Sequence, residues 1–413
     1  MNVTEGSTAY SDENGNLLFY SNGVGVLDDI AAVWNRNHQI MPNGLLTELT
    51  GNATTMQSSI VVPMPGSTTK YYLFTLDGYE SYYTPEYKGL TYSVIDMSLD
   101  NGLGDVTDKA VPITTPAIPF LSEQMTATQH ENGTDYWLIL HESNHINLNT
   151  NKFILYQISA SGISAPITQH IGIEDSPGMQ STLQVSSQGN KIAFNWEVFD
   201  FNNETGVLSN PVATGSWGYR EFSRDGRFLY VAKWNGGLYQ YDLDAENVSA
   251  SVYEVSAYED FGQIQIGPDD KIYVAMQFNG AYQPYLSVIN NPNQQGAACS
   301  LSMNAITLVD GVSDMGLPNF IDFVPKDHTG ITENQELIEI DLYPNPATSS
   351  IMIKFDSEEQ AVITLTDLQG KVVMNKIRVL SGNNIDLSSI GSGNYLVKME
   401  FAGEVHWRPL IVE

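Results

Sequence analysis

The residues His141-Glu-Ser-Asn-His145 match the H-E-x-x-H string of zinc metalloproteases. In those enzymes a helix places both histidines on one face as zinc ligands, and the glutamate acts as the general base. Here the string follows Tyr136–Leu140, a run typical of a β-strand, and asparagine-rich sequence comes after it. No third ligand is identifiable. We therefore expect a strand that ends in a polar loop, and we predict no metal-binding residues.

A second oxygen-rich segment, Asp200-Phe-Asn-Asn-Glu-Thr-Gly206, resembles a short calcium loop. Its glycine comes one place late for an EF-hand, and no glutamate stands at the twelfth position. A solvated hairpin loop is the favoured interpretation, with calcium as a weak alternative and no other cofactor. The sequence also lacks a G-x-S-x-G nucleophile elbow and a phosphate-cradling glycine loop. It thus provides no catalytic residue, and whether the protein is an enzyme stays open.

Tyrosines gather in one short segment, at Tyr79, Tyr82, Tyr83 and Tyr87. Exposed tyrosine rows can stack on sugars or anchor a protein interface. The same rings could instead brace a long loop. We retain these four tyrosines as candidate ligand contacts.

A turn followed by a short β-rich run recurs along residues 1 to about 325, and helical periodicity is almost absent. The glycine, asparagine and aspartate of these turns suit tight hairpins, and the runs after them are rich in tyrosine, phenylalanine, tryptophan, isoleucine and valine. The copies of the turn begin at Asp12, Pro65, Glu131, Gln188, Asp225 and Pro268. Their spacing, about 37–65 residues, is close to the roughly 40–50 residues of a propeller blade, with the longer gaps as loop insertions.

This spacing predicts a β-propeller of six or seven blades, with Gly316–Val324 as a candidate closing strand. The best-formed unit, Phe222–Ala232 followed by Gly237–Leu243, is similar to a blade of WD40-like or lactonase-like propellers. A β-sandwich is the competing architecture, but it does not explain the recurrence.

The composition excludes several classes of protein. The chain has 413 residues, with 48 acidic and 18 basic side chains and a formal net charge of −30. A chain this acidic is not a general binder of nucleic acid or of anionic membranes, because both need clustered lysine and arginine. The single cysteine, Cys299, excludes an internal disulfide and a cysteine-rich zinc site. No apolar run approaches the ~18 residues of a membrane-spanning helix.

The character of the chain changes after a polar linker at 326–336. Residues 337–413 contain about seven short alternating strands, which is the pattern of a small Ig-like β-sandwich. The expected fold is therefore all-β, a propeller over 1–325 followed by this sandwich.

The C-terminal segment resembles the type A C-terminal sorting domain of the type IX secretion system of Bacteroidota. The resemblance rests on Leu342–Ala347, Leu365–Lys371, Ile385–Lys398 and Leu410–Glu413, which occur in the family's order. The last strand usually carries lysine or arginine shortly before its end, and here it reads His406-Trp-Arg-Pro409. The positions that match the sorting signal are Tyr343, Pro344, Asn345, Pro346, Gly370, Lys371, Gly393, Tyr395, Leu396 and Val397.

The body is similar, less specifically, to propellers of secreted proteins that carry this sorting domain. Members usually begin upstream with a signal peptide and a first strand, so the resemblance implies that both are missing here. We accordingly expect the first sheet to lack a strand or to borrow one from Asp322–Val324. The resemblance implies a secreted or outer-membrane surface location and the type IX machinery as a partner.

Three functions are compatible with this organisation. The first is a non-enzymatic extracellular propeller that binds a glycan or a surface protein. The second is a propeller hydrolase or lactonase with a metal or carboxylate site in the channel mouth, to which His38, His130 and His170 could contribute. The third is a structural surface subunit. Neither nucleic acid nor a membrane span is expected.

Overall fold

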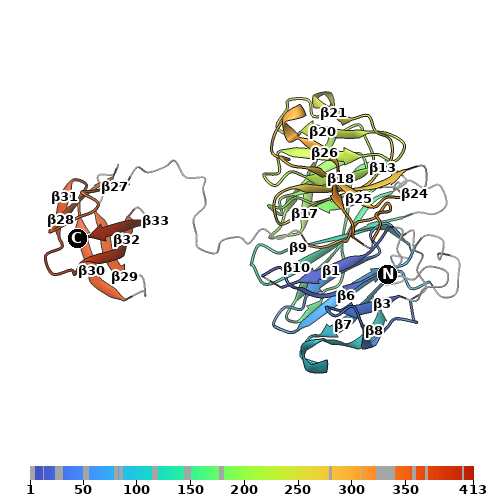
Figure 1. The fold of residues 1–413 in the computed structure, drawn as a ribbon, viewed down its shortest axis with the longest axis horizontal. Helices are drawn as coiled ribbons and strands as arrows, with labels where there is room; N and C mark the ends of the chain where they lie inside the picture. The colour runs from blue at the N-terminus through green and yellow to red at the C-terminus, as the bar shows by residue number, and fades with distance from the viewer. Residues whose placement is uncertain are drawn as a thin grey trace. The chain divides into compact units, whose positions relative to one another are not determined.

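The structure is a computed structural model in which the chain separates into two compact units, residues 1–326 and 327–413. It describes residues 5–12, 14–23, 31–49, 55–78, 82, 87–113, 120–143, 150–175, 181–278, 281–309, 311–321, 340–355, 360–367, 371–401 and 404–413. Each unit is considered by itself. Figure 1 shows both as β-structures, and the described residues contain only three short 3₁₀ turns, η2 (Asp100–Gly102), η3 (Ser249–Ser251) and η4 (Gly296–Cys299).

The described residues of unit 1 form six antiparallel sheets, each built from consecutive strands. Sheet 1 contains β1 (Thr8–Ser11), β2 (Leu17–Ser21), β3 (Ala32–Asn35) and β4 (Ile40–Leu45). Sheet 2 contains β5 (Ser59–Pro63), β6 (Lys70–Leu76), β7 (Leu90–Asp96) and β8 (Asp105–Pro112). Sheet 3 contains β9 (Leu121–Gln129), β10 (Tyr136–Glu142) and β11 (Thr150–Ser159), with β12 (Gly162–Ile163) and β13 (Ile167–Asp175) beside β11.

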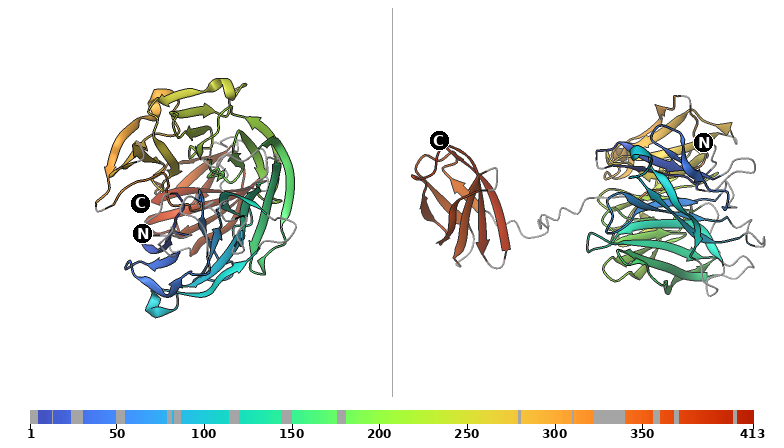
Figure 2. Two further views of the ribbon diagram at one scale, coloured as in Figure 1. Left: turned by 90° about the vertical axis from the view of Figure 1, so that its right-hand side faces the viewer. Right: turned by 90° about the horizontal axis from the view of Figure 1, so that it is seen from below.

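Sheets 4 to 6 follow the same plan. Sheet 4 contains β14 (Gln184–Val185), β15 (Lys191–Phe194), β16 (Glu197–Asn202) and β17 (Val207–Ala213). Sheet 5 contains β18 (Tyr219–Phe222), β19 (Phe228–Ala232), β20 (Leu238–Asp242) and β21 (Tyr253–Ser256). Sheet 6 contains β22 (Phe261–Ile266), β23 (Ile272–Phe278), β25 (Tyr285–Ile289) and β26 (Leu301–Thr307), with β24 (Ala281–Tyr282) beside β23. The left panel of Figure 2 shows the six sheets around a common centre. Unit 1 is a β-propeller, as the sequence predicts.

Each of the six recurring turns leads into the second strand of a different sheet, β2, β6, β10, β15, β19 and β23. Aspartates fix two of these turns. A carboxylate oxygen of Asp12 accepts the amides of Asn14 and Asn16, and Ser223 donates to Asp225, after which Gly226 takes a φ of 72°. Such side-chain bonds and a positive φ close a tight hairpin at low cost. The repeat in the sequence therefore marks the same turn in every sheet.

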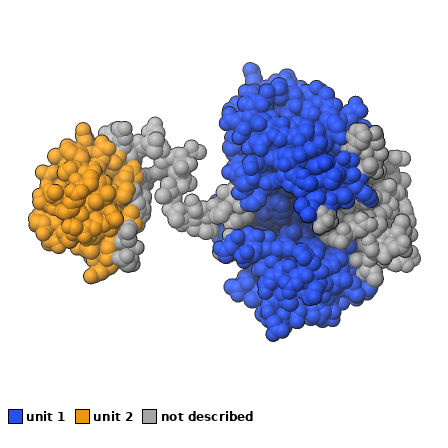
Figure 3. Space-filling model, in the orientation of Figure 1, with its two compact units in different colours: residues 1–326 blue, residues 327–413 orange. Residues whose placement is uncertain are grey.

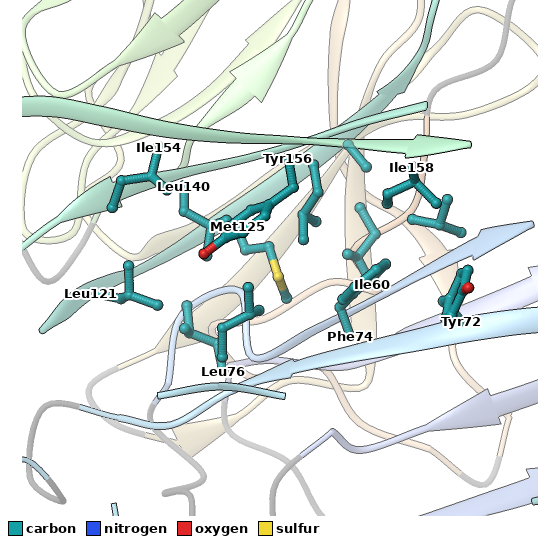
Figure 4. Packing of buried hydrophobic residues seen from close by; sticks show 14 of the residues in the cluster. Ile60, Tyr72, Phe74, Leu76, Leu121, Met125, Leu140, Ile154, Tyr156 and Ile158 are labelled. Carbon is teal, nitrogen blue, oxygen red and sulfur yellow. The ribbon is translucent and has the colours of Figure 1, made fainter. Parts of the chain in front are cut away.

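Apolar side chains from neighbouring sheets pack together at five successive junctions, from sheets 1 and 2 to sheets 5 and 6. Figure 4 shows the junction of sheets 2 and 3, where Ile60 and Phe74 lie close to Met125 and Tyr156. No cluster among the described residues joins sheet 6 to sheet 1. Unit 1 is hollowed on the side that Figure 3 turns to the viewer, and Figure 1, in the same orientation, places β1 below this hollow and β25 above it.

A strip of chain, 313–319, closes the ring at this seam by hydrogen bonds instead. Gln263 of β22 donates its amide to the carbonyl of Met315, and Ser7 and Pro318 form a parallel bridge. A Cβ atom at Gly316 would lie 1.7 Å from the carbonyl oxygen of Glu5, so the two segments meet where only glycine fits.

The expectation that the first sheet lacks a strand is wrong. Its four strands all come from local sequence, and the strip 313–319 contributes a bridge rather than a strand. The strand expected to be missing is present as β1, which pairs antiparallel with β2. The outermost strand, β4, contains Pro42 and Gly44, which the edge of a sheet tolerates. Asp322–Val324 lies outside the described residues.

Residues 55–58, which lead into β5, are buried and hydrogen-bond to several other sheets. Gln57 exchanges two hydrogen bonds with the main chain of Leu183, at 2.8 and 3.1 Å, and its own amide donates to Glu123. The side chain of Gln263 donates to the carbonyl of Met56 at 2.7 Å. The segment before β5 is therefore bonded to β9, to β22 and to the residue that precedes β14.

Unit 2 is a two-sheet sandwich. One sheet has the order β27 (Ile340–Tyr343), β28 (Ser350–Phe355), β31 (Asn383–Asp386), and the other has β30 (Val372–Val379), β29 (Ala361–Asp367), β32 (Gly393–Phe401), β33 (Glu404–Val412). Alternate side chains such as Ile351, Ile353 and Ile363 are buried between the sheets. The predicted Ig-like sandwich is thus observed.

Candidate functional site

One end of the propeller sheets carries the connections between second and third strands and the segments that enter each first strand. We call it the loop face, and its best-described part is formed by residues 195–196, 214–218 and 233–237 of sheets 4 and 5. Sequence reasoning did not select any of these residues.

The side chain of Arg220, on β18, is fully buried beneath this part of the loop face. Its guanidinium donates to the carbonyl oxygens of Asn195 and Ser216 and to the hydroxyl of Thr214. Arg220 therefore fixes two loop-face connections from below. Among the residues that the structure describes, no carboxylate lies within 4 Å of it, and burial lowers the pKa of its guanidinium to about 9.

Lys233 and Tyr239 lie above Arg220. The ammonium of Lys233 stands 4.6 Å from the centre of the Tyr239 ring, within range of a cation–π interaction. Burial, and then the charge of Arg220, lower the pKa of Lys233. A tight turn runs from Lys233 to Gly237, and the main-chain amide of Lys233 donates a hydrogen bond to the carbonyl of Gly237. Trp234 lies in this turn and is 38% exposed.

Tyr241 completes the support of this region, because its hydroxyl donates to Ser216 Oγ at 2.7 Å. The resulting group, which we call the Arg220 site, contains a buried cation, a half-buried cation and exposed aromatic surface. Such a site can bind and orient a ligand. A weak signal of it stands in the sequence, since Arg220 and Glu221 are two charges inside a short, otherwise aromatic strand.

The H-E-x-x-H string begins at the end of a strand. His141 and Glu142 end β10, and Glu142 forms an ion pair with Lys152 at 2.9 Å; His145 lies outside the described residues. His141 lines a cavity of about 10 Å³, room for about one water, together with Thr150, Asn195 and Glu197. Its Nδ1 contacts the carbonyl of Glu142 at 2.7 Å, and burial lowers its pKa to about 4.

Two of the four candidate tyrosines are described. Tyr82 is 5% exposed and its hydroxyl donates to the carbonyl of Leu121, while Tyr87 is half-buried and accepts the amide of Leu121. Both rings contact Phe120. They therefore brace the entry to β9 in this structure, and ligand contact by this group stays a prediction. Tyr79 and Tyr83 lie outside the described residues.

The remaining sequence candidates have local partners. His38 contacts Tyr20, His130 stacks on Trp137, and His170 contacts Asn151. They lie on different elements, and no group of three metal-binding side chains occurs in the described ranges. The segment expected to be a hairpin loop is only partly one, because Asp200 lies on β16 and the turn covers 203–206. Asp200 pairs with Lys191 of β15 at 3.0 Å and accepts from Asn210.

The first sorting motif of unit 2 is attached to the last strand. Asn345 donates to the carbonyl of Pro409 and accepts the amide of Ile411, both at 2.9 Å. Ala347 adds a parallel bridge to Val412, and the amide of Glu413 donates to its carbonyl. The asparagine of the Tyr-Pro-Asn-Pro motif thus joins the beginning of the domain to its end.

The other motif residues have several local roles. The hydroxyl of Tyr343 contacts the sulfur of Met352, and Tyr395 donates to the carbonyl of Gly391. Val397 belongs to the core, whereas Leu396 is 36% exposed. Gly393 begins β32 and Lys371 closes the β29–β30 turn on Asp367, while Gly370 lies outside the described residues.

Residues 341–413 match the family of secretion system C-terminal sorting domains. The chain is a β-propeller protein with a type IX sorting domain. It is secreted or displayed at the cell surface, and the sorting domain implies the type IX machinery as a partner. None of the helices in the described ranges has the length and apolarity to cross a membrane.

The solved structures similar to this type IX cargo are distant in sequence. PorZ of Porphyromonas gingivalis, described as an essential surface component of the type IX secretion system, is 11% identical, with a TM-score of 0.30, over 93% of this chain and 68% of its own. The Dos1 propeller is 10% identical, with a TM-score of 0.41, over 74% of each chain. Hsv2 of Kluyveromyces lactis is 10% identical, with a TM-score of 0.39, over 68% of this chain and 79% of its own. A search of curated proteins found no match.

Proposed function

We propose that this exported propeller is an extracellular binding protein and that the Arg220 site on its loop face holds a glycan. The observation that carries the proposal is the turn at Lys233–Gly237, which displays Trp234 beside a cation that stands over Tyr239. An exposed ring beside fixed polar groups is a common means of orienting a ligand.

The rigidity of the surroundings supports this role. Arg220 fixes the two neighbouring connections by hydrogen bonds to their carbonyl oxygens. A ligand would therefore meet a prepared surface, which reduces the ordering cost of binding.

The test is retention of the full chain on immobilised polysaccharides taken from the surface of the producing bacterium. We expect retention that Trp234→Ala reduces about tenfold or more, as loss of a central aromatic contact does at many interfaces. Tyr253→Ala is the matched control, because Tyr253 is 40% exposed on the outermost strand β21.

Two outcomes would contradict the proposal. Equal retention of Trp234→Ala and the unaltered protein would exclude the Arg220 site as the binding surface. New reducing ends released from the polysaccharide, and lost in a variant of the His141 cavity, would favour the hydrolase alternative instead.

A further inference from the structure

We infer that the ligand of the Arg220 site is a sugar that carries a carboxylate, of the uronic acid class. This inference rests on the proposed function and adds the charge of the ligand. It follows from the placement of the two cations rather than from the exposed ring.

Neither cation of this site forms an ion pair with a described residue, whereas six other described cations of unit 1 do. Where other described lysines and arginines approach acidic residues, they form ion pairs, as Lys70–Asp96, Lys152–Glu142, Lys191–Asp200, Arg224–Asp270, Arg227–Asp242 and Lys271–Asp269 do. Within the described ranges, neither Arg220 nor Lys233 has a carboxylate within 4 Å. The charge of Glu197 acts on Arg220 from beyond ion-pair distance, whereas the charge that acts on Lys233 is that of Arg220 itself. Lys233 is therefore the cation of this site that an anionic ligand would stabilise most.

Arg220 and Lys233 would have different roles in binding. Arg220 is wholly buried and its terminal nitrogens are occupied by Asn195, Thr214 and Ser216, so it is a positioning residue that adds positive potential from below. Lys233 is only half-buried, and its ammonium rests on a π-face that leaves it able to donate hydrogen bonds. Lys233 is therefore the group that would contact a carboxylate directly.

The aromatic groups favour a saccharide over other carboxylates. Trp234 is exposed directly after Lys233, and Tyr239 lies beneath the ammonium, so an apolar face and a cation are presented side by side. The ring of a uronic acid offers both an apolar C–H face and one carboxylate. A long polyanion would be repelled by the acidic body, because like charges repel within about a Debye length. We therefore expect a short acidic segment or chain end to be the recognised unit.

The test is calorimetric titration of the full chain with trigalacturonate and with its fully methyl-esterified form, which is alike except for its charge. We expect trigalacturonate to bind at least about tenfold more tightly, as one charge-assisted hydrogen bond allows. Lys233→Gln should remove this difference while it leaves the weak binding of the ester unchanged. Lys271→Gln, which removes an exposed lysine from a turn of sheet 6, is the matched control and should preserve the difference.

Other results would overturn the inference. Equal affinity for the two forms, or a preference that survives Lys233→Gln, would show that Lys233 does not recognise the carboxylate of the ligand. If the ester binds as well as the acid, and Trp234→Ala abolishes both, the proposed glycan function stands and only the inference fails. If neither form binds and polysaccharide retention is also absent, the proposed function fails too. Binding of triglutamate as tight as that of trigalacturonate would exclude a saccharide-specific site.

Discussion

The side-chain amide of Asn319, in the strip that closes the ring, donates a 3.0 Å hydrogen bond to the main-chain carbonyl of Met125 on β9 of sheet 3. The same amide donates to Ser59 at 3.2 Å, and the carbonyl of Asn319 accepts from the hydroxyl of Thr8 at 2.7 Å. The closing strip is thus bonded through Asn319 to sheet 1 by its main chain and to sheets 2 and 3 by its side chain. Ring closure depends on a few buried polar contacts.

We therefore expect Asn319→Ala to destabilise unit 1 by about 2–3 kcal/mol, because two buried carbonyls lose their donor. Urea unfolding followed by tryptophan fluorescence measures the loss. Asn43→Ala, which removes an exposed amide bonded to Asp105, is the control and should cost less than about 1 kcal/mol. Equal costs for the two variants would contradict the closing role of Asn319.

The buried His141 should make stability depend on pH. Its pKa is about 4 when folded and about 6.5 when unfolded. As the pH falls from 6.5 to about 4, the unfolded chain takes up a proton at this residue and the folded chain does not. The free energy of unfolding should fall by up to about 3 kcal/mol across this window.

Urea unfolding at several pH values checks this dependence against two variants. His141→Gln should flatten the profile between pH 6.5 and 4, whereas His38→Asn, at an exposed turn with a φ of 60°, should leave it unchanged. An unaltered profile in His141→Gln would mean that this imidazole does not stay neutral on folding.

In the sorting domain, Asn345→Ala should loosen the last strand, since the carbonyl of Pro409 and the amide of Ile411 lose their partners. We expect faster hydrogen exchange in β33 and a loss of about 1–2 kcal/mol in the stability of this unit. Asn384→Ala, at an exposed position of β31, is the control. Unchanged exchange in β33 would contradict the attachment.

Much of the fold could be predicted from the sequence, because the six turns carry side chains that fix them locally. The first strand of sheet 1, β1, is only four residues long and has a single aromatic side chain, so little in the sequence marks it as a strand. The Arg220 site could not be predicted, because Arg220 stands on β18 and Lys233 in the turn after β19, and they become neighbours only when these two strands pair. That neither forms an ion pair with a described carboxylate is visible only in three dimensions.

Export provides a further prediction. Deleting residues 327–413 from a gene with a signal peptide, in a host that has type IX secretion, should leave a folded propeller in the periplasm. Localisation by cell fractionation and protease accessibility checks this outcome. Normal arrival of the truncated protein at the cell surface would mean that unit 2 is not the secretion signal.

The most direct test of the central claim is hydrogen exchange of the full chain with and without trigalacturonate. Ligand at the Arg220 site should slow exchange in residues 214–218 and 233–237 and leave the turn 130–135, at the opposite end of sheet 3, unchanged. Protection confined to that opposite end, or absent from both loop-face segments when the ligand is saturating, would contradict binding at the loop face.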